Sequence, residues 1–216
     1  MKSKSNYFEP YVFNPWQRVK LSETLMLPHE PSNLGEGENS TQPMLEIASD
    51  AIWKQPIRWN KKLAMDEFFC PAVLGSTCDW CDSEVQSETR ERLWKIIDRT
   101  PFLDWFLVSR RATDILTCLP MDWGYGYDNV ALGVHVERGE DLSQVNSLTK
   151  IRAEQRFIVV SPNFTKVGAL NLRGIHFVMV RTPSSDVGQH NKKKWYRELK
   201  DHCKTKGVPL KIVRAQ

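Results

Sequence analysis

Residues 130–136 read Val130-Ala131-Leu132-Gly133-Val134-His135-Val136, an almost unbroken apolar run of strand length. Runs of the same kind recur after residue 66 and barely alternate between apolar and polar positions. This pattern is typical of strands that are buried on both faces, as in a parallel sheet. The other predicted strands are Phe68–Leu74, Leu103–Val108, Phe157–Val160, Ile175–Val180 and Val208–Val213, and a seventh is predicted at Tyr11–Phe13.

Helical patterns lie between these strands. Ser83-Glu84-Val85-Gln86 matches a capping box and predicts that a helix begins there. Thr100-Pro101 ends this helix, because a proline disfavours helical geometry in the residue before it. Apolar residues at helical spacing predict two further helices, over Leu142–Ile151 and Trp195–Cys203, the second ended by Gly207. The alternation predicts right-handed β-α-β units.

The fold class expected from this alternation is α/β. A complete eightfold barrel takes about 250 residues, and the 216 residues here include a long irregular stretch. We therefore expect an incomplete (βα)6-type parallel barrel or an open doubly wound sheet, with ligands bound at the carboxyl ends of the strands. Residues 28–50 are rich in Pro, Gly and polar residues and predict a loop. The expected division is an N-terminal extension with an acidic loop over residues 1–51 and a barrel domain over residues 52–216.

The composition is that of a globular chain, with 41% hydrophobic and 26% charged residues. No apolar run approaches the ~20 residues of a membrane span, and no apolar segment of a signal peptide follows Met1. We therefore expect no membrane partner and a cytoplasmic location. The five cysteines, an odd number, favour reduced thiols or metal ligands over disulfides.

Basic residues cluster in two places, although the net charge is only +4. Residues 191–216 carry nine Lys or Arg against two Asp or Glu. Basic residues also alternate with tryptophans over residues 53–62. Both segments could hold nucleic acid, by phosphate contacts and by base stacking; a solvated helix face and packed indoles are the structural alternatives. The candidate residues are Trp53, Arg58, Trp59, Lys61, Lys62, Lys192, Lys193 and Lys194.

Three cysteines, Cys70, Cys78 and Cys81, are spaced as C-x7-C-x2-C. The C-x2-C part can aim two thiolates at one metal ion. Zinc would need a fourth ligand, for which Cys118, His29 and His135 are the candidates, whereas an iron–sulfur cluster with one open iron needs only three. The alternative is that these cysteines are reduced and partly buried.

Four segments together resemble a known family. They are PIRWN (Pro56–Asn60), TPFLDWFLVSRR (Thr100–Arg111), LPMDWGYGYDNVALGVHVE (Leu119–Glu137) and LKDHCKTKGVPL (Leu199–Leu210). Their order and spacing resemble the phage gp-thirty-seven/sixty-eight family, which is common in phages and prophages. The resemblance covers about residues 52–213. It implies a radical-SAM-like barrel, in which three cysteines after an Asn-Pro hold a [4Fe–4S] cluster for S-adenosylmethionine.

This chain departs from the family pattern where the chemistry would lie. No cysteine follows Asn14-Pro15, and none occurs before Cys70. Ser161-Pro162-Asn163 stands where the family has Cys-Glu-Pro, and Arg181-Thr182-Pro183-Ser184 stands where it has Gly-Gly-Glu-Ser. The resemblance therefore implies a radical-SAM-like protein that has lost its cluster and, with it, the family's chemistry.

The residues that remain at the expected strand ends are suited to an anion, because guanidinium groups bind phosphate and carboxylate through forked hydrogen bonds. Pairing of these arginines with Glu137 or Asp186 is the structural alternative. The candidate anion-binding residues are Arg110, Arg111, His135, Glu137 and Arg181.

Three functions are therefore expected, the first being favoured. The first is a cofactor-free, non-catalytic protein of a bacterial host cell that binds an anionic ligand, nucleic acid, or a phage or host protein. The second is a radical enzyme that modifies a nucleotide, with [4Fe–4S] and S-adenosylmethionine relocated to Cys70, Cys78 and Cys81. The third is a virion or assembly protein.

Overall fold

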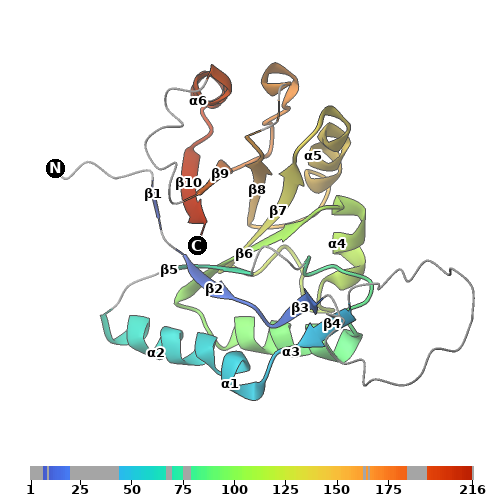
Figure 1. Cartoon of the computed structure of the whole chain (residues 1–216), viewed down its shortest axis with the longest axis vertical. Helices are drawn as coiled ribbons and strands as arrows, with labels where there is room; N and C mark the ends of the chain where they lie inside the picture. The colour runs from blue at the N-terminus through green and yellow to red at the C-terminus, as the bar shows by residue number, and fades with distance from the viewer. Residues whose placement is uncertain are drawn as a thin grey trace, which may run out of the picture.

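The computed structural model describes residues 7–8, 10–19, 44–66, 70–74, 79–162, 164, 166–183 and 194–215. Within these residues the chain is an α/β protein with a curled parallel sheet and a separate pair of antiparallel strands (Figure 1). The antiparallel pair consists of β3 (Trp16–Val19) and β4 (Met44–Ile47).

The large sheet has eight strands among the described residues, in the order β1-β10-β9-β8-β7-β6-β5-β2, and every neighbouring pair is parallel. Its strands are β1 (Tyr7–Phe8), β2 (Tyr11–Phe13), β5 (Cys70–Leu74), β6 (Leu103–Ser109), β7 (Val130–Val136), β8 (Gln155–Val160), β9 (Phe177–Pro183) and β10 (Leu210–Ala215).

The first two strands of the chain lie at opposite edges of the sheet. β1 pairs with β10, and β2 pairs with β5. Because two residues separate β1 from β2, the same stretch of chain reaches from one edge of the curled sheet to the other (Figure 1). The sheet is thus an incomplete barrel, and the first strands of the expected N-terminal extension belong to it.

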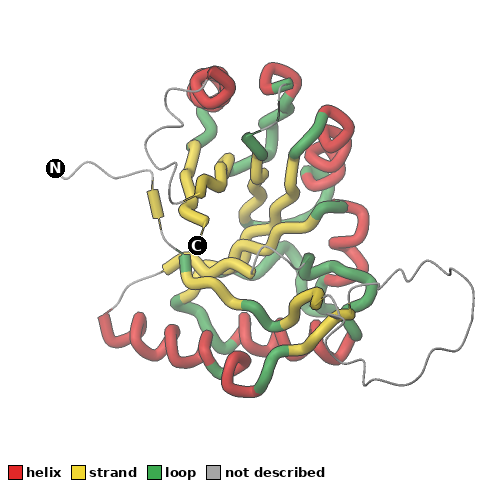
Figure 2. Tube along the Cα trace, in the orientation of Figure 1, coloured by secondary structure: helices red, strands yellow, loops and turns green. Residues whose placement is uncertain are grey.

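Helices surround the sheet on its outer side (Figures 1 and 2). They are α1 (Asp50–Trp53), α2 (Gln55–Asp66), α3 (Ser87–Asp98), α4 (Ala112–Cys118), α5 (Leu142–Leu148) and α6 (Lys194–Lys206), with single 3-10 turns η2 (Gly139–Asp141) and η3 (Val167–Ala169). Within the described part of the chain, none of these helices is long and apolar enough to cross a membrane.

The two faces of the sheet pack into two separate apolar clusters. The outer face packs against the helices through residues such as Trp105 and Leu132. The smaller inner cluster contains Phe106, Phe157 and Phe177. Phe157 and Phe177 stack with their ring centroids 4.9 Å apart. The middle of the barrel is therefore filled by aromatic rings, and its two ends are left for polar residues.

Most of the predicted strands are confirmed with small shifts of their ends, and Val130–Val136 matches β7 residue for residue. Gly207 has φ 68° and ends α6 as predicted. The predicted capping box is wrong: α3 begins at Ser87. Before it, the Asp82 carboxylate accepts a hydrogen bond from the Glu84 amide, at 3.0 Å. This contact holds the preceding residues in a turn, so Ser83 does not cap the helix.

The structure also contains elements that the sequence patterns did not predict. The segment 53–62 lies almost entirely in α1 and α2, for which no helix was predicted. Residues 44–47, inside the predicted loop 28–50, form β4, while residues 28–43 lie outside the described part of the chain. Helix α4 has no long apolar face and also escaped prediction.

Candidate functional site

Polar side chains gather on the inner face of the sheet at the carboxyl ends of its strands. Side chains two residues apart on a strand share a face, so His135 on β7 follows Ala131 and Gly133 inward, and Arg181 on β9 follows Phe177 and Met179. Arg110 comes directly after β6. Arg110 and Arg181 both lie close enough to His135 to affect its charge. Two of the arginines that the sequence placed at the strand ends, Arg110 and Arg181, thus lie around His135.

Asp79 fixes the backbone at Arg110. Its Oδ2 accepts hydrogen bonds from the Ser109 hydroxyl, at 2.9 Å, and from the Arg110 amide, at 2.8 Å. Its Oδ1 accepts a hydrogen bond from the Cys81 amide, at 2.9 Å. One carboxylate therefore ties the loop after β5 to the end of β6 and holds Arg110 in place.

Asp141 has the same role at the end of β7. Its Oδ2 accepts hydrogen bonds from the backbone amides of Glu137 and Arg138, both at 2.8 Å. The Glu137 side chain turns back, and its Oε1 lies 3.1 Å from Nδ1 of His135. Asp141 is thus engaged with the backbone and Glu137 with the imidazole. In the described part of the chain, neither carboxylate forms an ion pair with Arg110 or Arg181.

The surroundings of this site disfavour positive charge. Burial lowers the pKa of His135 below its usual value, and the nearby guanidinium groups lower it further, while Glu137 opposes them. Burial also lowers the pKa of Arg181, although that side chain keeps contact with solvent. A bound anion would oppose these effects at His135 and Arg181.

Arg111 lies outside this group. Its Nε forms an ion pair with Asp114, at 2.7 Å, and its side chain is 65% exposed. Of the five predicted anion-binding residues, Arg110, His135, Glu137 and Arg181 are brought together, while Arg111 belongs to the start of α4.

A comparison of the sequence with protein families gives a match. A family model described as "Protein of unknown function (DUF5131)" matches residues 26–212. The chain belongs to the DUF5131 family. The match includes the residues of the strand-end site and leaves out β1 and β2. No curated protein and no solved structure matches the chain.

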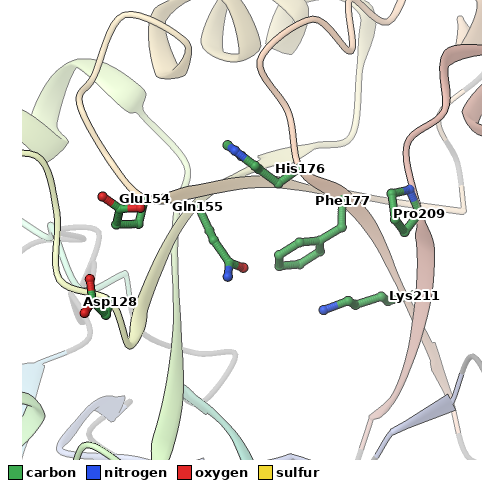
Figure 3. Close-up of a pocket in the computed structure, with 7 residues that line it drawn as sticks. All are labelled: Asp128, Glu154, Gln155, His176, Phe177, Pro209 and Lys211. Carbon is green, nitrogen blue, oxygen red and sulfur yellow. The ribbon is translucent and has the colours of Figure 1, made fainter.

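A pocket of about 590 Å³ lies at the opposite end of the barrel in this DUF5131 member, where β8, β9 and β10 begin (Figure 3). Its lining combines the carboxylates Asp128 and Glu154 with Lys211. The Lys211 ammonium lies 4.0 Å from the centre of the Phe177 ring. The pocket is larger than the space a single ion needs, but its mixed charges favour no anion. The sequence patterns gave no indication of it.

The predicted nucleic-acid residues fall on different sides of the molecule. Arg58, Lys61 and Lys62 are exposed on α2, whereas Lys194 begins α6, and Figure 1 shows these two helices at opposite ends of the fold. They therefore do not extend one continuous surface. Lys192 and Lys193 lie outside the described residues.

The two tryptophans of this prediction take part in packing. Trp53 is 2% exposed and packs edge-on against Phe13, with ring centroids 5.6 Å apart. Trp59 stacks on Tyr11 at 4.7 Å. The Trp53 ring is thus already buried, so a base could stack on it only after a rearrangement of the core.

The cysteine prediction is only partly covered by the described residues. The Cys70 side chain and the whole of Cys78 lie outside them. Cys81 is buried in the layer between sheet and helices, its thiol contacts Cys118, and burial raises its pKa. Cys118, a candidate fourth ligand for zinc, is the described cysteine that lies beside it. Among the described residues, no group of three or more His, Cys, Asp or Glu is placed to hold a metal ion.

Sequence reasoning missed the two aspartates that position the site. Asp141 follows Arg138 and Glu137, from whose amides it accepts hydrogen bonds, by three and four residues, so a search for side-chain contacts to nearby backbone amides would have found it. Asp79 lies 31 residues before Arg110. No local pattern reports a contact at that separation.

Proposed function

We propose that this chain is a binding protein for a small phosphate-bearing or carboxylate-bearing ligand, held at the carboxyl end of the barrel by Arg110, His135 and Arg181. The observation that carries the proposal is the convergence of these three groups, with the neighbouring carboxylates already engaged elsewhere. Guanidinium groups that have no carboxylate partner among the described residues favour an anion that accepts forked hydrogen bonds.

The position of the site supports the proposal. Open parallel sheets and barrels bind ligands at the carboxyl ends of their strands, where loops from several strands meet. Here Asp79 and Asp141 hold the ends of β6 and β7 by hydrogen bonds of 2.8 to 2.9 Å. Such preorganisation lowers the entropy lost when a ligand binds.

The resemblance to phage radical-SAM-like proteins suggests how such a site could have evolved. In our proposal the barrel retains the ligand end of such a protein, and arginine and histidine replace the cluster chemistry. A relocated cluster at Cys70, Cys78 and Cys81 gains no support from the described residues, because the Cys70 side chain and Cys78 lie outside them. A role in virion assembly has no described contact that favours it.

The proposal can be tested with inorganic pyrophosphate as the probe, in calorimetric titrations of the full chain at pH 7.5. We expect one pyrophosphate per chain. Arg110→Gln and Arg181→Gln should each weaken binding by about 10- to 100-fold, the value of a lost charge-assisted hydrogen bond of ~1.5–3 kcal/mol.

Arg111→Gln is the matched control, because it removes the same charge from the neighbouring residue, which is paired with Asp114. It should leave the affinity within about twofold, as expected for an exposed ion pair worth under ~1 kcal/mol. Equal losses in all three variants would indicate a diffuse charge effect and would contradict the site, as would the absence of binding to the unmodified chain.

A further inference from the structure

Two cysteines that are far apart in the sequence meet beneath the loops at the carboxyl end of the barrel. Cys81 lies in the turn after β5, and Cys118 is the last residue of α4. Sγ of Cys118 lies 4.0 Å from the Cys81 carbonyl oxygen, and each thiol affects the pKa of the other. The two residues are 4% and 6% exposed.

The backbone of each cysteine is held in place by a separate contact. The Cys81 amide donates to Asp79, at 2.9 Å. The Cys118 carbonyl accepts a hydrogen bond from the Trp94 indole, at 3.0 Å. Trp94 in turn packs edge-on against Trp80, the neighbour of Cys81, with ring centroids 5.5 Å apart. The pair is therefore set in a rigid aromatic layer that keeps the two thiols together.

The two thiols differ in acidity. The hydrogen bond from Cys81 lowers the pKa of Cys118 to about 6, helped by the Thr117 hydroxyl and the charge of Arg90, against the effect of burial. Burial raises the pKa of Cys81, and the contact with Cys118 raises it further. At neutral pH, Cys118 is thus the nucleophile of the pair and Cys81 its protonated partner.

We propose that Cys81 and Cys118 are a reversible disulfide site, oxidised by hydrogen peroxide. The Cys118 thiolate attacks one peroxide oxygen, the O–O bond breaks, and a sulfenic acid forms with release of hydroxide, which takes up a proton as water. The Cys81 thiol then attacks the sulfenic sulfur, its proton leaves with the departing hydroxyl as a second water, and the S–S bond forms. Two thiols and one peroxide give one disulfide and two waters, and an added dithiol reverses the oxidation by exchange.

The contact between the thiols determines this outcome. A sulfenic acid without a nearby thiol is oxidised further to the sulfinic acid, which is irreversible in most proteins. Here Sγ of Cys118 lies 4.0 Å from the Cys81 carbonyl oxygen, so the second thiol is close by and the two sulfurs need only approach one another to form an S–S bond of about 2.04 Å. Cys203 offers the contrast within the same chain: it is buried on α6, and burial raises its pKa to about 11.

The test is a peptide map of the fully reduced, folded chain after treatment with hydrogen peroxide and alkylation of the remaining thiols. We expect a loss of two hydrogens in the intact mass, a linked pair of peptides that contain Cys81 and Cys118, and full reversal by dithiothreitol. Cys203 should stay reduced and react with peroxide at least about tenfold more slowly than Cys118, because so little of it is thiolate.

Four variants and one oxidation of the unfolded chain keep the test independent of any single substitution. Cys118→Ser and Cys81→Ser should abolish the linked peptide, whereas Cys203→Ser should not change it. Cys78→Ser should also leave it unchanged. The same oxidation in concentrated guanidinium should give mixed pairings if the folded structure directs the reaction.

Two results would overturn the proposal. One is a link between Cys78 and Cys81 in place of the Cys81–Cys118 link. The other is oxidation of Cys118 to the sulfinic or sulfonic acid, with no linked peptide, in folded chain. Both are read from the unmodified protein, so a variant that fails to fold would not affect them.

Discussion

At the residue scale, the strand-end site depends on described carboxylates that are engaged with groups other than Arg110 and Arg181, while Asp186 lies outside the described residues. Glu137 is engaged with His135, and Asp141 accepts hydrogen bonds from backbone amides. His135 itself is only partly exposed, and burial lowers its pKa from the usual 6.5. The imidazole therefore stays neutral at neutral pH, and a bound anion would favour its protonated form.

The affinity of the site for an anion should consequently rise as the pH falls. The anion raises the pKa of His135, so the complex takes up a proton and binding strengthens below about pH 6.5. Titration with sulfate, whose charge is constant over this range, followed by NMR from pH 7.5 to 5.5, measures the effect. His135→Gln should flatten the profile, and a profile that this substitution leaves unchanged would contradict the role of His135.

The lowered pKa of His135 also makes the stability of the folded chain depend on pH. The folded chain holds the pKa of His135 below that of the unfolded chain, so the unfolded chain binds this proton first. The free energy of unfolding without anion should therefore fall as the pH drops below about 6.5. Urea unfolding at pH 7.5 and 5.5 measures this change. The free energy of unfolding should fall less between these two pH values in His135→Gln than in the unmodified chain, and an identical fall in both proteins would contradict the role of His135.

Thr100 shows a second consequence at this scale. It is fully buried; its hydroxyl donates to the Ile96 carbonyl, at 2.8 Å, and accepts from the Trp105 indole, at 3.0 Å. Thr100→Val should cost about 1–3 kcal/mol in urea unfolding, because the buried indole loses its acceptor. Thr205→Val is the control, since the exposed Thr205 hydroxyl makes the same contact to the carbonyl four residues earlier. Its effect should stay within about 0.5 kcal/mol, and equal losses would contradict the role of burial.

At the element scale, the strands were predictable and several helices were not. Continuous apolar runs such as Val130–Val136 report burial on both faces directly, whatever the rest of the fold does. Helix α4, by contrast, begins without a side-chain cap of its own. The Ala112 amide at its start donates to the Gln144 side chain, at 2.8 Å. Such a contact between distant elements has no local signature in the sequence.

The candidate site was predictable to a similar extent. That strand ends converge follows from the parallel alternation, so Arg110, His135 and Arg181 could be named in advance. The separation of Arg111 from them could not, because its ion pair with Asp114 depends on where α4 begins. The contact between Cys118 at the end of α4 and Cys81 in the turn after β5 likewise depends on the folded sheet, which brings the two segments together.

The centre of the barrel is tightly packed at Gly133 of β7, where the Phe157 ring occupies the space that a side chain would take. A Cβ added at Gly133 would lie 2.5 Å from Cζ of Phe157, closer than real contacts allow. Gly133→Ala should therefore destabilise the chain by about 1–3 kcal/mol through overpacking. Phe157→Leu in the same chain should recover part of this loss.

Gly168→Ala is the control for this prediction, because a Cβ there meets no atom within 4 Å. Thermal unfolding of the unmodified chain, Gly133→Ala, the double variant with Phe157→Leu, and Gly168→Ala measures these changes in stability. A neutral Gly133→Ala would show that the strands can shift apart without cost and would contradict the tight inner packing.

At the scale of the whole molecule, the N-terminal strands complete the sheet. Phe13 on β2 is fully buried and makes edge contacts with Trp53 of α1 and Trp105 of β6, with ring centroids 5.6 and 5.8 Å apart. Phe13→Ala should cost about 3–5 kcal/mol, the usual loss for a buried phenylalanine. Urea unfolding measures it, and a loss below about 1 kcal/mol would show that this strand is peripheral to the fold.

The most direct test of the anion site is to locate a heavy anion in it. Crystals of the full chain soaked in tungstate, a phosphate analogue with strong anomalous scattering, would show where the anion binds. The expected result is an anomalous peak within hydrogen-bond distance of Arg181 and His135, with Arg110 beside it. A peak only along the basic face of α6, or none at the carboxyl end of the barrel, would contradict the proposed function.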